Sequence, residues 1–562
     1  MTRGAWQWPP ARTSRWSGTS ARSATRAAIC RRVGGLGHTR WATHGGVTRE
    51  NAHPQLDCAA HLALVHNGIV ANEAELRVAL ARAGHRIRSQ TDTELIAHLI
   101  EDLLEQTSPG PQRLLRATLA AFEKLRGLNA IVALDLRSGE LAAAKSGSPL
   151  VLGLGADGHF IASDPAALLP HTRELTFVED GQAVSLDGDR ARLFEIATLR
   201  ELEPETVTVD WQPEPATRDG HPDYMSKETA EQPALLRNLA ARVRGGVQEL
   251  AGRIEQSSEV LMIGCGSAAH AAQAAQHLFA RIAGRRVSWA TASEVDHLLP
   301  FMDRQSLLVA LSQSGETMDV LDAVRRARER GAQIAALTNV EGSSLWRTAD
   351  LRIGLGVGPE RCVLATKSLS AKLAILYLTA HALRQQLPAA EAALERAAAD
   401  IEDMLGEARR AHLQRIARSI ASKEHLYVLG RGPSYALALE TALKIKEVSY
   451  IHAEGFASGE LKHGVIALIE PGTPCIALVP KDDTESDVLA GALQVKARGA
   501  QIIGIGPEPH AAFDHHIPVA DLGDATLIAN AIPGQVLGYE LARLRGHDPD
   551  RPRNLAKSVT VK

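Results

Sequence analysis

The stretch Leu307-Leu-Val-Ala-Leu-Ser-Gln-Ser-Gly-Glu-Thr317 decides the fold that we expect for the second half of this chain. Its five consecutive apolar residues predict a buried strand, and such strands are typical of parallel sheets covered on both faces. An amphipathic run that contains Val320, Leu321 and Val324 follows at once. A helix is therefore expected to begin directly after the strand.

The turn between this strand and this helix is rich in hydroxyl groups. Backbone N–H groups are unpaired at a helix N-terminus, and the helix dipole favours an anion there. Ser312, Gln313, Ser314 and Thr317 therefore predict a phosphate site. An ordinary helix cap is the alternative, but one hydroxyl suffices for capping, and the pattern Ser-x-Ser-Gly-x-Thr is denser than that.

An internal repeat follows from two pairs of similar segments. Val260–Gly266 and Leu426–Gly432 both end an apolar run in a glycine turn, and Gly-Ala-Gln-Ile begins at Gly331 and again at Gly499. The two pairs are 166 and 168 residues apart, which predicts two copies of one doubly wound α/β unit. In the second copy, Pro480-Lys-Asp-Asp-Thr-Glu485 replaces the hydroxyl-rich turn. Because carboxylates repel phosphate, only the first copy is expected to hold an anion.

Composition limits the class of protein. The 562 residues suggest three or four domains, and 45% hydrophobic with 23% charged residues is a globular composition. The net charge of −3 argues against nucleic acid or a membrane as the main partner, and no apolar run approaches the ~20 residues of a membrane span. We therefore expect a cytoplasmic enzyme without a metal or other cofactor. The cysteines show neither paired metal-ligand spacing nor disulfide density: Cys30, Cys58, Cys265, Cys362 and Cys475.

The domain boundaries follow changes in composition. Residues 1–33 hold seven arginines and three tryptophans but no Asp, Glu or Leu. A transit peptide, a disordered basic arm and a wrong gene start or reading frame are the alternatives, and we favour the last. We expect an α+β domain over residues 34–209 and a linker over 210–235. Two α/β domains follow over 236–390 and 391–545, and residues 546–562 form a tail that docks at the active site.

A second set of candidate residues lies in the second copy. Glu440, Lys444 and Glu447 are spaced to share one helical face, although a solvated face with ion pairs would look the same. His463 follows in Glu460-Leu-Lys-His-Gly464, where a surface loop histidine is the alternative. These residues supply carboxylates, an amine and an imidazole, which are the groups of acid–base chemistry.

Together these motifs resemble the glucosamine-6-phosphate synthase family, the isomerising glutamine–fructose-6-phosphate aminotransferases. The resemblance implies a truncated glutaminase domain of the α+β N-terminal-nucleophile type, followed by two doubly wound α/β sugar isomerase (SIS) domains. It also implies a homodimer that makes glucosamine 6-phosphate, the first step of amino-sugar synthesis. The motifs occur in family order: His38-Thr-Arg-Trp-Ala-Thr-His-Gly45, Asn51-Ala-His-Pro54, His66-Asn-Gly68, Thr91-Asp-Thr-Glu94, Ser312–Thr317, Glu440–Glu447, Glu460–Gly464 and Arg553–Val561.

The resemblance also implies a role for each candidate in the SIS half. Lys557 forms a Schiff base with open-chain fructose 6-phosphate, and Glu447 moves a proton between C1 and C2. Lys444 supports the intermediate, and His463 of the partner subunit assists ring opening. The sugar phosphate is held by two turns: Ser312, Gln313, Ser314 and Thr317, and Cys265, Gly266 and Ser267.

In the glutaminase half, the resemblance implies that Arg40 binds the glutamine carboxylate and Asp92 its amino group. Asn67 and Gly68 would form the oxyanion hole, and Trp41 would lie at the ammonia channel.

The chain departs from the family in three places. It has no Met-Cys-Gly-Ile start to supply the glutaminase nucleophile, so the chain as written is expected to use ammonia slowly and glutamine not at all. Ala268 and Ala365 replace serines of the sugar site, each a loss of roughly 0.5–1.5 kcal/mol. An ammonia-dependent or isomerase-only enzyme for another ketose phosphate, or a sugar-phosphate sensor, is the alternative. A sensor would need no Schiff-base lysine.

Overall fold

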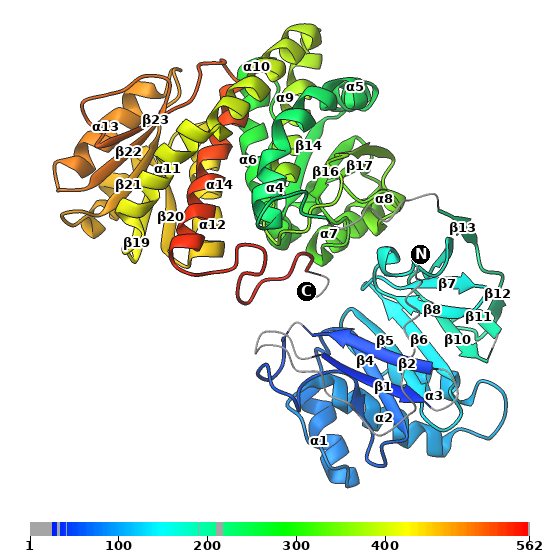
Figure 1. Ribbon diagram of the computed structural model, residues 1–562. Coiled ribbons are helices and arrows are strands. Elements are labelled where there is room, and N and C mark those ends of the chain that lie inside the picture. Colours follow the sequence, from blue (N-terminus) through cyan, green and yellow to red (C-terminus); the bar gives the residue numbers. More distant parts are fainter. Residues whose placement is uncertain (1–24, 31–33, 41, 189, 210–216, 560–562) are drawn as a thin grey trace, which may run out of the picture. The chain divides into compact units, whose positions relative to one another are not determined.

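The structure is a computed structural model, which describes residues 25–30, 34–40, 42–188, 190–209 and 217–559 (Figure 1). The chain divides into two compact units. The first unit runs to residue 213, and the second covers residues 214–558.

The first unit is built on antiparallel sheets. Its largest sheet has seven strands in this order: β12 (Glu201–Leu202), β11 (Arg190–Glu195), β10 (Gln182–Asp187), β6 (Leu141–Ser146), β5 (Asn129–Asp135), β4 (Leu62–Gly68) and β3 (Gln55–Leu56). A four-stranded sheet has the order β13 (Thr206–Thr208), β9 (Glu174–Phe177), β7 (Val151–Gly155) and β8 (Gly158–Ala162). A further antiparallel pair is β1 (Thr25–Cys30) with β2 (Gly34–Thr39). The helices are α1 (Glu73–Ala83), α2 (Asp92–Gln106) and α3 (Arg113–Phe122).

The central strand β5 shows why this sheet is covered on both faces. Side chains alternate along a strand, so Ile131 and Ala133 pack with residues of α2 and α3, whereas Val132 and Leu134 pack with residues of β7 and β10 on the opposite face. The α+β architecture that we expected for residues 34–209 is therefore present.

The second unit contains two five-stranded parallel sheets with the same strand order. The first sheet is β15 (Ser288–Thr291), β14 (Glu259–Gly264), β16 (Ser306–Ser312), β17 (Gln333–Thr338) and β18 (Leu351–Gly354). The second is β20 (His452–Ala457), β19 (His425–Gly430), β21 (Pro474–Leu478), β22 (Gln501–Gly506) and β23 (His515–Pro518). The predicted repeat and its doubly wound topology are confirmed, and β16 is buried along its whole length.

The glycine turns of the two copies share one backbone geometry. Gly266 has φ of 54° and Gly432 has φ of 56°, a left-handed conformation in which a side chain would be strained. Each glycine caps the helix after the first strand of its copy, α6 (Ser267–Leu278) and α12 (Pro433–Ser449). The repeat in the sequence thus reflects a repeated strand–turn–helix unit.

Helices fill the space between the two parallel sheets. Figure 1 shows α6, α12 and α14 (Thr526–Leu544) between the first sheet, in green, and the second, in yellow to orange. One continuous apolar core joins both copies. The other helices of this unit are α4 (Tyr224–Ala230), α5 (Gln232–Gln256), α7 (Met318–Glu329), α8 (Ser344–Thr348), α9 (Lys367–Ala382), α10 (Leu387–Leu405), α11 (Glu407–Ile420) and α13 (Glu485–Lys496).

The structure differs from our expectation of a linker over residues 210–235. Residues 224–230 form α4, and α5 begins at Gln232. The Asp223 side chain accepts a hydrogen bond from Ser226 N, which caps α4, and Met225 is fully buried. The prolines and glycine just before these residues led us to extend the predicted linker over the start of α4. In the described part of the chain, no helix has the length and apolar character needed to cross a membrane.

Candidate functional site

The hydroxyl-rich turn lies at the carboxyl end of β16, where α7 begins. Ser312 Oγ accepts a hydrogen bond from Gly315 N (2.9 Å) and lies 3.1 Å from Thr317 Oγ1. Thr317 is the residue that precedes α7, yet its side chain makes no capping hydrogen bond. Gly315 has φ of 71°, and a Cβ there would lie 2.0 Å from Ser343 Oγ. The backbone of the turn is therefore packed closely against Ser343. Because Thr317 does not cap α7, the alternative of an ordinary helix cap does not explain the hydroxyl groups of the turn.

The second predicted turn, Cys265-Gly266-Ser267, lies beside the first because β14 and β16 are adjacent parallel strands. The neighbour of β14 on the other side is β15, so the strand order reverses at β14, and crevices at such points bind ligands in doubly wound sheets. Ser267 is buried and donates to Glu440 Oε1 (2.9 Å). Burial raises the pKa of the Cys265 thiol to about 11, so the thiol stays protonated. The structure thus brings both turns to one edge of the sheet.

The C-terminal tail docks on the same region. Lys557 Nζ lies 2.7 Å from Glu360 Oε2 and 3.4 Å from the Leu364 carbonyl oxygen. The next residue, Ser558, makes a hydroxyl contact of 3.0 Å with Ser314. The amine of Lys557 and the hydroxyl-rich turn, which are far apart in the sequence, are therefore neighbours in the fold.

Glu440, Lys444 and Glu447 form one buried network on α12. Lys444 Nζ lies 2.7 Å from Glu447 Oε2 and 3.5 Å from Glu440 Oε1, and only 1% of its side chain is exposed. Burial alone would lower the pKa of Lys444, but the two carboxylates raise it above its usual value. Glu440 also accepts from His270 Nδ1 (2.7 Å). The alternative of a solvated helix face is wrong, because this charged face is turned inward.

His463 lies outside the hydrogen bonds and ion pairs of this network. It ends a 3-10 turn, Ser458–His463, and is exposed. Within the described part of the chain its side chain makes no hydrogen bond or ion pair, so the network of α12 is assembled without it.

The glutaminase candidates gather around the end of β4 and the start of α2. Asn67 Oδ1 lies 2.8 Å from His38 Nε2, and Gly68 has φ of 137°. Asp92 Oδ2 accepts from Val70 N (3.0 Å). Burial lowers the pKa of Arg40, and the Asp92 carboxylate opposes this change, so the two charges are neighbours. Arg40 also donates to loop carbonyl groups, among them Gly46 O at 3.1 Å. Trp41 lies outside the described residues.

Comparison with known proteins assigns the family. The SIS domain model matches residues 253–382 and 419–517, and a glutamine amidotransferase domain model matches residues 38–170. The chain is 40% identical to the "Glutamine--fructose-6-phosphate aminotransferase [isomerizing]" of Symbiobacterium thermophilum, over 94% of this chain and 89% of that protein. This chain belongs to that aminotransferase family. A relative of the same name from Thermus thermophilus is 40% identical over the same shares of the two chains, and one from Streptomyces coelicolor is 38% identical.

A solved structure of this family agrees with the second unit. The C-terminal domain of glucosamine-fructose-6-phosphate aminotransferase from Francisella tularensis has a TM-score of 0.54 and 30% identity, and it covers 60% of this chain and 100% of its own. The predicted family and fold class, a glutaminase-type domain before two SIS domains, are confirmed.

Two charged residues beside the candidate site were not predicted from the sequence. Glu360 Oε1 accepts from the N–H groups of Thr366 and Ser368 (both 3.0 Å), and its other oxygen contacts Lys557. Lys372 of α9 is buried, and burial lowers its pKa to about 8, while Glu360 opposes that change. Lys372 lies within the otherwise apolar run of α9, and this isolated lysine was the sequence signal from which a buried charged residue could have been predicted.

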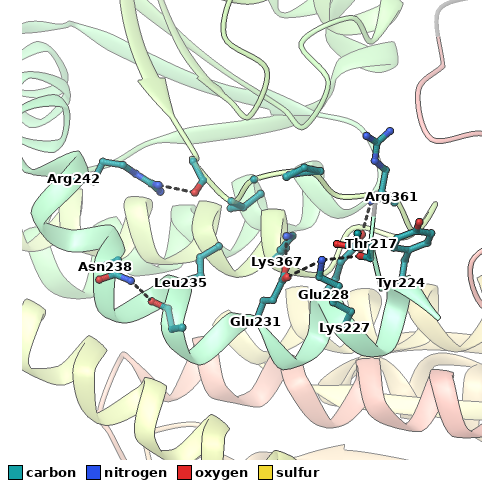
Figure 2. A pocket seen from close by; sticks show the side chains of 15 residues that line it. Thr217, Tyr224, Lys227, Glu228, Glu231, Leu235, Asn238, Arg242, Arg361 and Lys367 are labelled. Carbon is teal, nitrogen blue, oxygen red and sulfur yellow. Dashed lines mark hydrogen bonds and ion pairs between the residues drawn. The ribbon is translucent and has the colours of Figure 1, made fainter. Parts of the chain in front are cut away.

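The loop that carries Glu360 also borders a cavity of about 380 Å³ between α4, α5 and residues 356–361 (Figure 2). Glu228 lines this cavity and accepts from Cys362 N (3.1 Å) and from Arg361 N. Burial, with Glu360 nearby, raises the pKa of Glu228 to about 8. None of the sugar-site candidates lines the cavity as the structure describes it, so we assign the surroundings of Glu228 to positioning the Glu360 loop.

The second copy uses the corresponding turn differently. Asp482 and Asp483 accept from Arg281, which follows α6 in the first copy, at 2.8 and 3.1 Å. Arg281 also lies 3.2 Å from Asp524. The acidic turn therefore contacts the first copy through ion pairs.

Proposed function

We propose that this chain converts fructose 6-phosphate to glucosamine 6-phosphate, with glutamine or ammonia as the nitrogen donor. The observation that carries the proposal is the position of Lys557, whose amine is held beside the turn that contains Ser314. The names of the relatives support the two substrates. The product would enter amino-sugar synthesis, and we place the enzyme in the cytoplasm.

Phosphate binding is assigned to the two adjacent turns. Ser312, Gln313, Ser314 and Thr317 offer polar side chains at the N-terminus of α7, where the helix dipole favours a dianion. Cys265, Gly266 and Ser267 border the same crevice from the neighbouring strand. With the phosphate fixed there, the carbon chain of the sugar would extend toward the tail.

The chemistry is assigned to Lys557 and Glu447. The lysine amine adds to the C2 carbonyl and water leaves, which forms an iminium that acidifies the C1–H bond. Ammonia, supplied free or released from glutamine, adds to this iminium at C2 and the lysine amine leaves, so that the new nitrogen stays on C2 as an imine. The carboxylate of Glu447, whose Oε2 lies 2.7 Å from Lys444 Nζ, then moves a proton from C1 to C2, which leaves an amine on C2 and the aldehyde at C1.

Two further groups complete the proposal. We assign His463 of the partner subunit to ring opening, because His463 is exposed and separate from the network of its own chain, and this requires a homodimer. In the glutaminase unit we assign Arg40 and Asp92 to glutamine, Asn67 and Gly68 to the oxyanion hole, and Trp41 to the ammonia channel.

The test is to trap the Schiff base. Borohydride reduction with fructose 6-phosphate present should attach the sugar to Lys557, as located by peptide mass spectrometry. Lys557→Arg should abolish both the adduct and product formation with ammonium, whereas Lys462→Arg, an exposed control, should change neither. An adduct on Lys444 instead would reverse the two lysine roles, and turnover by Lys557→Arg at the wild-type rate would refute the proposal.

A further inference from the structure

Four side chains outside both proposed sites converge in the glutaminase unit. Cys58 lies in the turn between β3 and β4, His85 follows α1, and His98 and Glu101 lie on one face of α2. One atom of each, the Cys58 sulfur, a ring nitrogen of each histidine and a Glu101 oxygen, lies within 4.8 Å of all the others. We call these four residues the Cys58–Glu101 cluster.

The spacing of the cluster agrees with the edges of a tetrahedron around zinc. Zinc bonds are about 2.3 Å to sulfur and about 2.0–2.2 Å to nitrogen or oxygen, so tetrahedral geometry places S···N pairs about 3.6 Å apart and N···O pairs about 3.4 Å apart. The Cys58 sulfur lies 3.4 Å from His85 Nδ1 and 3.5 Å from His98 Nδ1. Glu101 Oε2 lies 3.2 and 3.1 Å from the same two nitrogens. The ligand atoms are therefore already placed around a common centre.

The outer nitrogens of both histidines face carboxylates. His85 Nε2 lies 2.8 Å from Asp102 Oδ1, and His98 Nε2 lies 3.6 Å from Glu94 Oε1. Glu94 is itself fixed by the N–H groups of Arg88 and Ser89. At His85 this contact is the hydrogen bond by which a carboxylate holds the proton on the outer nitrogen of a metal-binding histidine, whereas His98 Nε2 is buried and makes no hydrogen bond within the described residues. His85 Nδ1 then presents a lone pair to the centre, and His98 Nδ1 does the same in the tautomer that carries its proton on Nε2.

Hydrogen bonds cannot satisfy this centre once the outer protons are in place. Glu101 Oε2 accepts from Cys58 N (3.1 Å), but the two Nδ1 atoms are then also acceptors, and the single proton of the Cys58 thiol can serve only one of them. The side chains of His85 and His98 are only 8% and 1% exposed, so water offers little compensation. A cation at the centre would satisfy all four groups at once.

We infer that the Cys58–Glu101 cluster is a structural zinc site. Thiolate with imidazole selects zinc over calcium or magnesium, and four protein ligands leave no open position for catalysis. The inference does not depend on the proposed function, because none of the four residues belongs to the glutamine or sugar sites.

The metal would join three segments that approach one another only in the folded unit. Gly84, with φ of 95°, turns the chain after α1 so that His85 reaches α2. Helix α2 begins at Asp92, which is a glutamine-binding candidate. Zinc would therefore fix the helix that presents Asp92 without contacting the substrate, and its contribution is to folding stability.

The test measures metal in the full 562-residue chain after expression with zinc and exhaustive dialysis. We expect one zinc ion per chain by mass spectrometry of metal content, and a background value in Cys58→Ala and His98→Ala. Cys475→Ala, a buried thiol of the second unit, and His61→Ala, an exposed histidine near the cluster, are matched controls that should retain zinc.

A second measurement uses the wild-type chain alone, in case the variants do not fold. Cobalt(II) added to metal-free protein should give the strong visible bands of tetrahedral cobalt and a thiolate-to-cobalt absorption in the near ultraviolet. Chelation should also lower the melting temperature, and zinc should restore it. Metal-free protein that gives only the weak spectrum of octahedral cobalt, or full zinc occupancy in folded Cys58→Ala, would overturn the inference.

Discussion

Replacing Glu360 with glutamine should release the tail lysine while leaving the loop of residue 360 in place. The oxygen that accepts from Thr366 N and Ser368 N is kept by the amide. The other oxygen, which lies 2.7 Å from Lys557 Nζ and also accepts from Ser368 Oγ (2.9 Å), becomes an NH₂ group that faces an ammonium ion. The Ser368 hydroxyl can turn to accept from this NH₂ group, so the contact that is lost is the one with Lys557.

The magnitude follows from the burial of this pair. The Glu360 side chain is fully buried and Lys557 is 26% exposed, so solvent screens their contact only in part. Hydrogen bonds to charged groups contribute about 1.5–3 kcal/mol, which corresponds to about a 10- to 150-fold change in the population of a docked tail. We expect product formation to fall by a factor in this range.

The assay separates positioning from substrate binding. The rate of borohydride trapping at Lys557 should fall with turnover, whereas the affinity for inorganic phosphate, which contacts the other end of the site, should stay constant. Glu329→Gln is the matched control, because Glu329 is paired with Arg325 at 2.6 Å on the surface and is 60% exposed. Surface pairs contribute little.

The reasoning would be refuted by one pattern of results. If Glu360→Gln folds, trapping at Lys557 keeps its wild-type rate and turnover does not change, then the ion pair seen in the structure does not position the tail. Loss of phosphate affinity with normal trapping would equally contradict the assignment, because it would place Glu360 at the wrong end of the site.

Three further predictions concern charge. Ser314→Asp should raise KM for fructose 6-phosphate tenfold or more with an unchanged circular dichroism spectrum, because like charges about 4 Å apart repel by about 1–4 kcal/mol; an unchanged KM would remove this turn from the site. Burial would raise the pKa of Glu360, but Lys557 and backbone N–H groups lower it from 4.5 to about 2, so the carboxylate's contribution to stability is complete above pH 4.5 and is lost as the pH falls toward 2. Acid unfolding of Glu360→Gln should lack this component, and a curve parallel to that of the wild type would contradict the pKa. Burial lowers the pKa of Lys372 from 10.5 to about 8, so wild-type stability should decrease as the pH falls from 10.5 to 8, and Lys372→Met should flatten this dependence in thermal melts.

The sequence predicted the parts of the fold that depend on local pattern. The apolar run before Ser312 is β16, and the two glycine turns at Gly266 and Gly432 are equivalent, because strand burial and left-handed glycine leave direct marks in a sequence. The start of α4 was missed since proline and glycine just before Asp223 outweighed one capping residue.

The sites were predictable only where their residues are close in sequence. Glu360 and Lys557 are brought together by the docking of the tail, which no local pattern encodes. The Cys58–Glu101 cluster draws on three segments, and only His98 and Glu101 share a helical spacing, so our search for paired cysteine spacing indicated no metal. In both cases tertiary packing supplies the information.

The ion pairs of Arg281 involve the acidic turn of the second copy, which corresponds to the hydroxyl-rich turn of the first copy. After duplication of one ancestral fold, a second binding crevice is free to diverge, and here Asp482 and Asp483 have made it an attachment point for the other copy. The contact therefore depends on both copies at once, because a change in either the acidic turn or Arg281 leaves the other side without this charge partner.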